Sequence, residues 1–383
     1  MTKWAEAVII GGGIVGCSIA YNLARLGLKK ICLFEKNYLA SGATGRCGAG
    51  VRMQWGTRAN CLLARESIRM YKQLPELLEI SGDIEFKQGG YLLLAYTTKM
   101  VEQFQKNLAL QNSLGIPARW VTPAEAKAIV PHLNTEGLLG ATFCPQDGHC
   151  NPFAATYMYA AAARKLGVSI YTHTSVTGIV VENYRVKAVE TEAGLVYTPI
   201  VVNAAGGYAA EINKLAGGAE LPIYPERHEI LVTEPVEAMQ TPMVMSFYHN
   251  LYCQQVPHGS FLIGIGNPDE PKGINHRSSW QFLREAAQKV SALMPVLAKL
   301  TVVRQWAGVY DMTPDRQPIL DEDERVAGLF VAAGFSGHGF MIAPMVGRLM
   351  AELITGSSLS LPIAMFRGRR FAEGNFFVEP AVV

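Results

Sequence analysis

The first chemical motif in the chain is a glycine-rich turn with an acidic residue placed downstream of it. Gly11, Gly13 and Gly16 follow a short apolar segment, and Glu35 ends a second apolar segment. In this G-x-G-x-x-G pattern the glycines permit a tight turn, close approach to a pyrophosphate, and close packing of a helix on a strand. The helix N-terminus offers free N–H groups to phosphates, and a carboxylate at Glu35 suits ribose hydroxyls. The spacing predicts a dinucleotide-binding βαβ unit.

A second glycine-rich loop, residues 334–340, lies between an apolar strand and a helix near the end of the chain. It directs another helix N-terminus at whatever the first motif binds. A helix dipole and N–H donors stabilise negative charge on a ligand bound there. The alternative is a C-terminal helix with a loosely capped start.

The composition limits the classes of protein that need to be considered. The 383 residues suffice for two domains, or for one large domain with an insertion. A formal charge of +2 gives no reason to expect nucleic acid or an acidic membrane surface as partner. The seven cysteines have neither C-x-x-C nor metal-ligand spacing, which disfavours a disulfide framework or a metal site and suits the cytoplasm. Glu6 and the glycine cluster interrupt the apolar N-terminal run, so we expect no signal peptide and no membrane span.

Apolar periodicity and capping residues predict the elements that position these loops. Helices are predicted over residues 58–77, 99–114, 153–165, 278–294 and 340–354, with a further capped start at Thr122. Strands are predicted over residues 7–10, 31–34, 85–96, 168–171, 176–182, 186–191, 200–202, 229–233, 243–247, 251–256, 261–265 and 328–332.

These elements predict an α/β fold with two interleaved domains. The Rossmann-like, nucleotide-binding domain would comprise residues 1–80, 146–214 and 306–383. An α+β substrate domain, built on a mixed or antiparallel sheet, would comprise residues 81–145 and 215–305. A substrate domain made of two excursions from the nucleotide domain places the ligand between them.

Six segments together carry a resemblance to a known family: residues 8–16, 34–36, 41–48, 201–206, 306–315 and 334–340. With them, almost the whole chain resembles the FAD-dependent D-amino-acid oxidase superfamily. The most similar branch holds the β subunits of sarcosine oxidase and of dye-linked L-proline dehydrogenase. The resemblance implies FAD-dependent oxidation of the Cα–N bond of a small amino acid or secondary amine (proline-, sarcosine- or glycine-like) by hydride transfer to flavin N5. It also implies a partner subunit or other electron acceptor, with FMN possible at an interface between subunits.

The family pattern assigns residues of this chain to the cofactor and to the substrate. Residues expected to contact FAD are Gly11, Gly13, Ile14, Val15, Gly16, Glu35, Lys36, Ser41, Thr44, Arg46, Cys47, Gly48, Val176, Ala205, Gly206, Gly308, Gly334, Ser336, Gly337, His338, Gly339, Phe340 and Met341. Arg52 matches a position that holds the substrate carboxylate, a task that suits a guanidinium fork, although a solvated surface arginine is the alternative. Tyr252 and His228 are expected to line the substrate cavity, with core packing as the alternative. His338 is expected to be a catalytic residue as well as a cofactor contact.

Four positions depart from the family pattern. Gly308 stands where monomeric sarcosine oxidases attach their flavin through a cysteine, so FAD is expected to be non-covalent. Leu262 and Met341 replace lysines near the flavin, and the loss of these cations makes rapid reaction with oxygen doubtful. Cys150 stands near the position of the histidine that tethers FMN in heterotetrameric sarcosine oxidase.

Two other functions stay open on the sequence. The chain could be a flavin-binding subunit with a mainly structural or electron-transfer role. It could also be a nicotinamide dehydrogenase, since Glu35 suits the ribose of NAD, although the loop at residues 334–339 argues against this.

Overall fold

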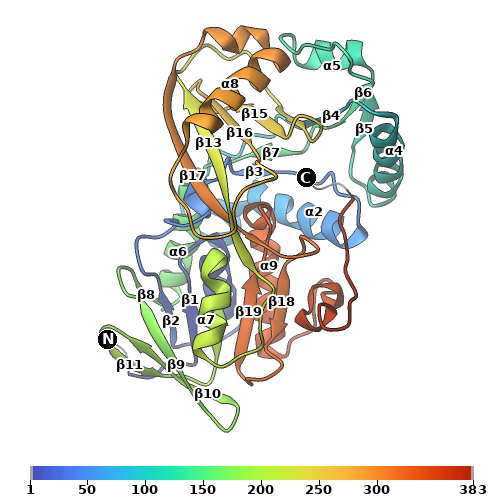
Figure 1. Cartoon of the computed structure of the whole chain (residues 1–383). Helices are drawn as coiled ribbons and strands as arrows, with labels where there is room; N and C mark the ends of the chain where they lie inside the picture. The colour runs from blue at the N-terminus through green and yellow to red at the C-terminus, as the bar shows by residue number, and fades with distance from the viewer. Residues whose placement is uncertain (1–2, 381–383) are drawn as a thin grey trace.

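The computed structural model describes residues 3–380, and its first sheet is the parallel sheet that the sequence predicts (Figure 1). Its strands, in spatial order, are β18 (Ile319–Glu322), β19 (Leu329–Ala333), β12 (Val201–Asn203), β1 (Ala7–Ile10), β2 (Ile31–Phe34) and β8 (Ser169–Tyr171). Every neighbouring pair is parallel except β18 and β19.

Two layers cover this sheet, and the alternation of side chains along β1 explains both. Ile9 faces a helical layer, and Val8 and Ile10 face the opposite layer, as expected when successive side chains point to opposite faces. The helical layer contains α1 (Ile14–Arg25), α2 (Arg58–Lys72), α3 (Leu74–Leu78), α6 (Pro152–Lys165) and α9 (Gly339–Thr355). The opposite layer contains the antiparallel strands β9 (Val176–Glu182), β10 (Arg185–Thr191) and β11 (Gly194–Tyr197).

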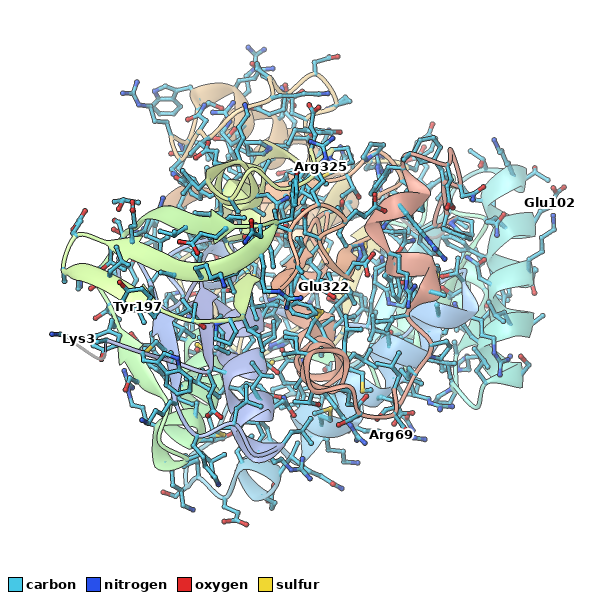
Figure 2. The ribbon with its side chains drawn as sticks, turned by 90° about the horizontal axis from the view of Figure 1, so that it is seen from below. Lys3, Arg69, Glu102, Tyr197, Glu322 and Arg325 are labelled. Carbon is cyan, nitrogen blue, oxygen red and sulfur yellow. The ribbon has the colours of Figure 1, made fainter. Side chains whose placement is uncertain are left out.

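The start of the chain is fixed to the edge of this three-stranded sheet. The backbone N–H of Tyr197 donates to the carbonyl of Lys3 over 3.0 Å, and the two residues lie together in the view from below (Figure 2). Helix α7 (Ala209–Leu215) and the short helix η2 (Gly206–Tyr208) follow β12.

The second large sheet has eight strands and mixed direction. In spatial order they are β17 (Val302–Met312), β13 (Tyr224–Thr233), β16 (Phe261–Ile265), β15 (Leu251–Gln255), β14 (Met243–Ser246), β4 (Tyr91–Ala95), β6 (Gly140–Cys144) and β5 (Arg119–Val121). Only β14 and β4 pair in parallel. Helices α4 (Thr98–Ser113), α5 (Pro123–Ile129) and α8 (Trp280–Leu293) pack against it.

The remaining short elements connect these layers. They are β3 (Gly50–Val51), β7 (Gly148–His149), η1 (Thr44–Arg46), η3 (Pro295–Lys299), η4 (Ala364–Phe366) and η5 (Gly368–Arg370). Strands β3 and β7 pair with each other. Within residues 3–380, none of the helices combines the length and the apolarity needed to cross a bilayer.

The predicted elements are largely present, and the α/β fold class is confirmed. The capped start at Thr122 is a capping box, in which its side chain and that of Glu125 bond each other's backbone N–H groups. The helix predicted over residues 58–77 is divided after Lys72, because Pro75 has no N–H for the carbonyl four residues earlier. The strand predicted over 85–96 is confined to β4. Strand β17 was not predicted, and it crosses the boundary expected between residues 305 and 306.

Candidate functional site

Three loops meet at one edge of the parallel sheet. They are the turn at residues 11–13 after β1, residues 204–206 after β12 and residues 334–338 after β19. Because β1, β12 and β19 are neighbouring parallel strands, their carboxyl ends lie at the same edge. Ligands of open α/β sheets bind outside this edge.

The first turn has no room for side chains. Gly11 has a φ of +115°, and a Cβ there would lie 2.3 Å from the carbonyl oxygen of Ala204. A Cβ at Gly16 would lie 2.0 Å from the carbonyl oxygen of Gly11, so the first turn of α1 packs directly on the loop. Gly13 is the N-cap of α1 and supplies no side-chain cap, which leaves the helix N-terminus suited to phosphate.

Glu35 fixes the end of β2 to this turn. Its carboxylate accepts hydrogen bonds from the backbone N–H groups of Gly12 and Asn37, both over 2.8 Å, and from the Ser41 hydroxyl over 3.2 Å. An ionised carboxylate has about four acceptor positions, so these three bonds leave capacity for a ribose hydroxyl.

The loop at residues 41–48 is attached to the eight-stranded sheet. The Arg46 guanidinium donates to the carbonyls of Ser41 and Ala307, each over 3.1 Å, and the indole of Trp306 donates to the carbonyl of Arg46 over 3.0 Å. The Arg46 Cβ lies 3.1 Å from where Gly308 would carry a Cβ, so this glycine allows the loop to approach β17. Thr44, in the same loop, accepts a hydrogen bond from the N–H of Ile14 over 3.2 Å. The loop therefore joins the nucleotide-type turn to the second sheet.

The second glycine loop is held by a buried carboxylate. The Asp311 side chain accepts from the N–H of Gly334 over 2.7 Å, and its carbonyl accepts from the N–H of Ser336 over 2.9 Å. Burial raises the pKa of Asp311 to about 6. The loop ends at His338, the N-cap of α9, whose side chain makes no capping hydrogen bond.

A cavity of about 500 Å³ lies between these loops and the eight-stranded sheet. The four predicted catalytic residues, Arg52, His228, Tyr252 and His338, all line it. Of the predicted cofactor residues, those that line it are Arg46, Cys47, Gly308, Ser336, Gly337, His338 and Met341. This volume is within the range of small-molecule and cofactor sites.

Arg52 is buried at one wall of this cavity, with 4% of its surface exposed. Its Cζ lies 4.1 Å from the ring centroid of Trp55, and its Nη1 donates to the carbonyl of Gln54 over 3.0 Å. Asp147 supports this segment by accepting from the N–H of Met53 over 2.7 Å and from the Gln54 amide over 2.9 Å. Burial raises the pKa of Asp147 to about 7.

His338 lies beside the same tryptophan, with its ring centroid 5.0 Å from that of Trp55. Neither ring nitrogen has a hydrogen-bond partner among the described residues. Burial, with a smaller contribution from Arg52, lowers the pKa of His338 to about 3. It is therefore a neutral imidazole with unused hydrogen-bonding capacity, an arrangement that fits a ligand with a polar ring edge.

His228 of β13 and Tyr310 of β17 line the cavity from the eight-stranded sheet. Their rings stack with centroids 3.7 Å apart and an interplanar angle of 16°. His228 Nε2 lies 3.1 Å from Glu226 Oε1. The ring of Tyr252 packs against Gly48 and Gly264, and burial raises the pKa of its hydroxyl well above the usual range.

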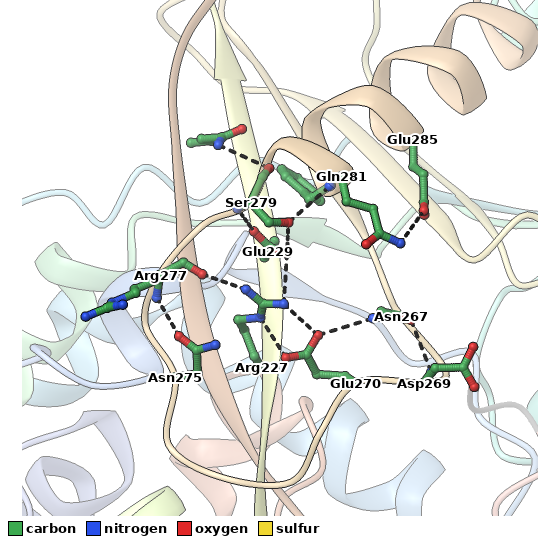
Figure 3. Close-up of polar contacts among 12 residues, drawn as sticks. Arg227, Glu229, Asn267, Asp269, Glu270, Asn275, Arg277, Ser279, Gln281 and Glu285 are labelled. Carbon is green, nitrogen blue, oxygen red and sulfur yellow. Dashed lines mark hydrogen bonds and ion pairs between the residues drawn. The ribbon is translucent and has the colours of Figure 1, made fainter.

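A strap, residues 266–279, runs from β16 to α8 along the cavity and supplies Gly266, Asn267 and Pro268 to its lining. Arg227 of β13 holds it, donating to both carboxylate oxygens of Glu270, over 2.7 and 2.9 Å, and to the carbonyl of Arg277 over 2.9 Å (Figure 3).

Some predicted cofactor residues lie away from this cavity, and some cavity residues were not predicted. Val176 begins β9 and packs in the apolar core beneath the sheet, and Lys36 Nζ lies 3.2 Å from the ring centroid of Tyr208. Sequence reasoning missed Trp55 and Glu226 in the lining. The spacing of Glu226 two residues before His228 on a strand was a usable signal, because such residues share a face.

Residues 6–353 match the sequence family described as DAO, FAD dependent oxidoreductase. The chain belongs to this family. Sarcosine oxidase subunit beta of Rhodobacter capsulatus is 30% identical to it, over 98% of this chain and 91% of that protein. Glycine oxidase of Geobacillus kaustophilus is 30% identical, over 96% and 97%. The crystal structure of L-proline dehydrogenase from P. horikoshii has a TM-score of 0.93 and 38% identity, covering 98% of this chain and all of that one.

The site of this FAD-dependent oxidoreductase fits the family's cofactor. The N-terminus of α1, which has no capping side chain at Gly13, and the side-chain-free turn at residues 11–13 suit a pyrophosphate. The uncapped N-terminus of α9 and the unpartnered imidazole of His338 lie where an isoalloxazine edge would need donors and a favourable dipole.

Proposed function

We propose that this enzyme oxidises the Cα–N bond of a small amino acid or secondary amine of the proline, sarcosine or glycine type, using non-covalent FAD. Bound FAD would supply the electron sink, accepting a hydride at N5. The observation that carries the substrate class is Arg52, a buried guanidinium at the wall of the cavity. The planar fork of arginine matches the two oxygens of a carboxylate.

The chain's own residues would position the substrate and exclude water. Arg52 would hold the carboxylate, with its guanidinium kept in place by Trp55 and the carbonyl of Gln54. Tyr252 and Tyr310 would form apolar walls against the carbon skeleton. Residues 81–145 and 215–305 are proposed as the substrate domain, together with the part of β17 that faces the cavity.

We propose a partner subunit or dye-like acceptor, rather than oxygen, as the recipient of the electrons. Met341 lines the cavity and Leu262 is on β16, and neither can supply the lysine cation that favours oxygen reduction. Two relatives are named as β subunits. Their names support assembly with another chain and an FMN at the interface between the two chains. Mixing the reduced enzyme with oxygen in a stopped-flow instrument tests this: slow reoxidation is expected, and reoxidation as fast as that of an oxidase contradicts it.

An anaerobic screen tests the reaction itself. The purified holoenzyme is mixed with L-proline, hydroxyproline, sarcosine and glycine, and the visible flavin absorption is followed. At least one amino acid is expected to bleach it. A flavin that none of these compounds bleaches would instead support a structural or electron-transfer subunit.

A further inference from the structure

The proposed oxidation requires a proton acceptor that the residues assigned so far do not provide. Amines such as these carry a proton at neutral pH, since the pKa of an aliphatic amino group lies above 7. A hydride leaves the α-carbon only when the nitrogen lone pair is free to form the C=N bond. A group in the cavity must therefore take one proton from the bound substrate.

Most ionisable groups that line the cavity are in the wrong state for this task. His338 has a pKa of about 3 and is too weak a base. Burial raises the pKa of the Cys47 thiol to about 11, and raises those of the Tyr252 and Tyr310 hydroxyls, so all three stay protonated. Both carboxylate oxygens of Glu229 are already engaged, because they accept hydrogen bonds from the N–H and the hydroxyl of Ser279, over 2.5 and 3.0 Å.

Glu226 and His228 have the geometry that these groups lack. They stand two residues apart on β13, so both side chains point to the face that lines the cavity. The side chains are 22% and 24% exposed, which leaves them accessible from the cavity. Gly308 is directly opposite His228 on β17 and places no side chain over the imidazole.

The contacts of the imidazole assign a role to each nitrogen. Nε2 is 3.1 Å from the Glu226 carboxylate and carries the hydrogen that this acceptor requires. In the neutral ring the lone pair is therefore on Nδ1. Stacking on Tyr310 fixes the plane of the ring, and the bond to the carboxylate fixes its rotation.

We propose, on the basis of the function proposed above, that His228 accepts the proton of the substrate's ammonium group and that Glu226 positions and charge-balances the imidazole. One N–H bond of the substrate breaks, one N–H bond forms at Nδ1, and no electrons leave the substrate in this step. The cavity then has a cationic end at Arg52 and an acid–base end at Glu226 and His228. These two groups match the carboxylate and the ammonium of a zwitterionic amino acid.

The charged and titratable groups around the pair come from four elements. Arg46, in the loop at residues 41–48, packs against Gly308, opposite His228, and its guanidinium donates to the carbonyl of Ala307 over 3.1 Å. Tyr310 of β17 covers one face of the imidazole. Arg227 and Glu229 are on β13 itself, and they bond Glu270 and Ser279 of the strap. Lys272 of the strap forms a backbone bridge with Glu226, but its Nζ lies 4.0 Å from the ring centroid of Tyr224.

The test is the pH dependence of anaerobic flavin reduction in the holoenzyme, with L-proline and then sarcosine as substrates, between about pH 6 and 10. His228→Asn is expected to slow reduction at subsaturating substrate about 100-fold at neutral pH, the lower end of the range for a general base. The loss should shrink as the pH approaches the substrate amine's own pKa. Glu226→Gln is expected to give a smaller loss with the same pH trend. The control is His258→Asn, because His258 is exposed and outside the cavity, and it should keep the wild-type profile.

Binding of tetrahydro-2-furoate, the ether analogue of proline, gives a second readout through the flavin spectrum. This analogue has no ammonium proton, so His228→Asn should bind it as the wild type does. Two results would overturn the role of His228 as proton acceptor and leave the proposed function intact. One is a pH profile of His228→Asn that runs parallel to the wild-type profile at every pH, and the other is a large loss of analogue binding. A wild-type flavin that neither substrate reduces would overturn the proposed function as well.

Discussion

Replacement of Arg52 by lysine tests how the substrate carboxylate is held. The guanidinium is 4% exposed and lies 4.1 Å from the ring centroid of Trp55, so water competes little for its donors. A hydrogen bond to a charged group is worth about 1.5–3 kcal/mol, and lysine keeps the charge but cannot make the two parallel bonds of the fork. Loss of one such bond should lower kcat/KM about 10- to 100-fold.

The assay compares L-proline with pyrrolidine, which has the same amine and no carboxylate. Arg52→Lys should lose most of its preference for proline while pyrrolidine oxidation changes little. The matched control is Arg316→Lys, because Arg316 also lines the cavity. An unchanged proline preference in Arg52→Lys, together with its loss in Arg316→Lys, would refute the assignment of Arg52.

Three further predictions concern the loops and the buried acid. Gly16→Ala, whose Cβ would lie 2.0 Å from a backbone carbonyl, should lower the free energy of unfolding by about 1–3 kcal/mol or more and reduce the FAD content. Gly42→Ala is the control, because the space around Gly42 is open, and it should change neither quantity. Thermal unfolding and flavin absorbance measure the two effects. Asp147 has a pKa of about 7, above its unfolded value of about 3.9, so its contribution to stability falls as the pH rises from 4 to 7. Asp147→Asn should remove this slope from a series of Tm measurements, and an unchanged slope would count against it. Glu270→Gln should loosen the strap and raise KM several-fold without loss of FAD. Glu285→Gln, which removes only an exposed hydrogen bond from Gln281 within α8, should leave KM unchanged.

The sequence was most informative where function depends on local geometry. The turn at Gly11 and the loop at residues 334–340 are recognisable because each is a strand, a glycine turn and a helix in succession. Their meeting at one edge follows from the parallel pairing of β1, β12 and β19. Residues 7–10 are apolar throughout, which is typical of a strand buried on both faces, and β1 is such a strand.

The sequence was least informative where contacts join distant segments. Asp147 supports Met53 across 94 positions, and no local pattern indicates that pairing. The first half of β13 was missed because it contains Pro225, which is disfavoured inside a sheet. The structure tolerates it because β16 pairs only with residues 229–232, and beside the proline the strap forms only the isolated bridge between Glu226 and Lys272.

The central claim is that three loops at the edge of the parallel sheet hold one FAD per chain. The flavin content of the purified chain, measured before and after denaturation, tests it most directly. The account predicts one FAD per chain, released intact when the protein unfolds. A chain that carries no flavin and takes up none when FAD is added would contradict it.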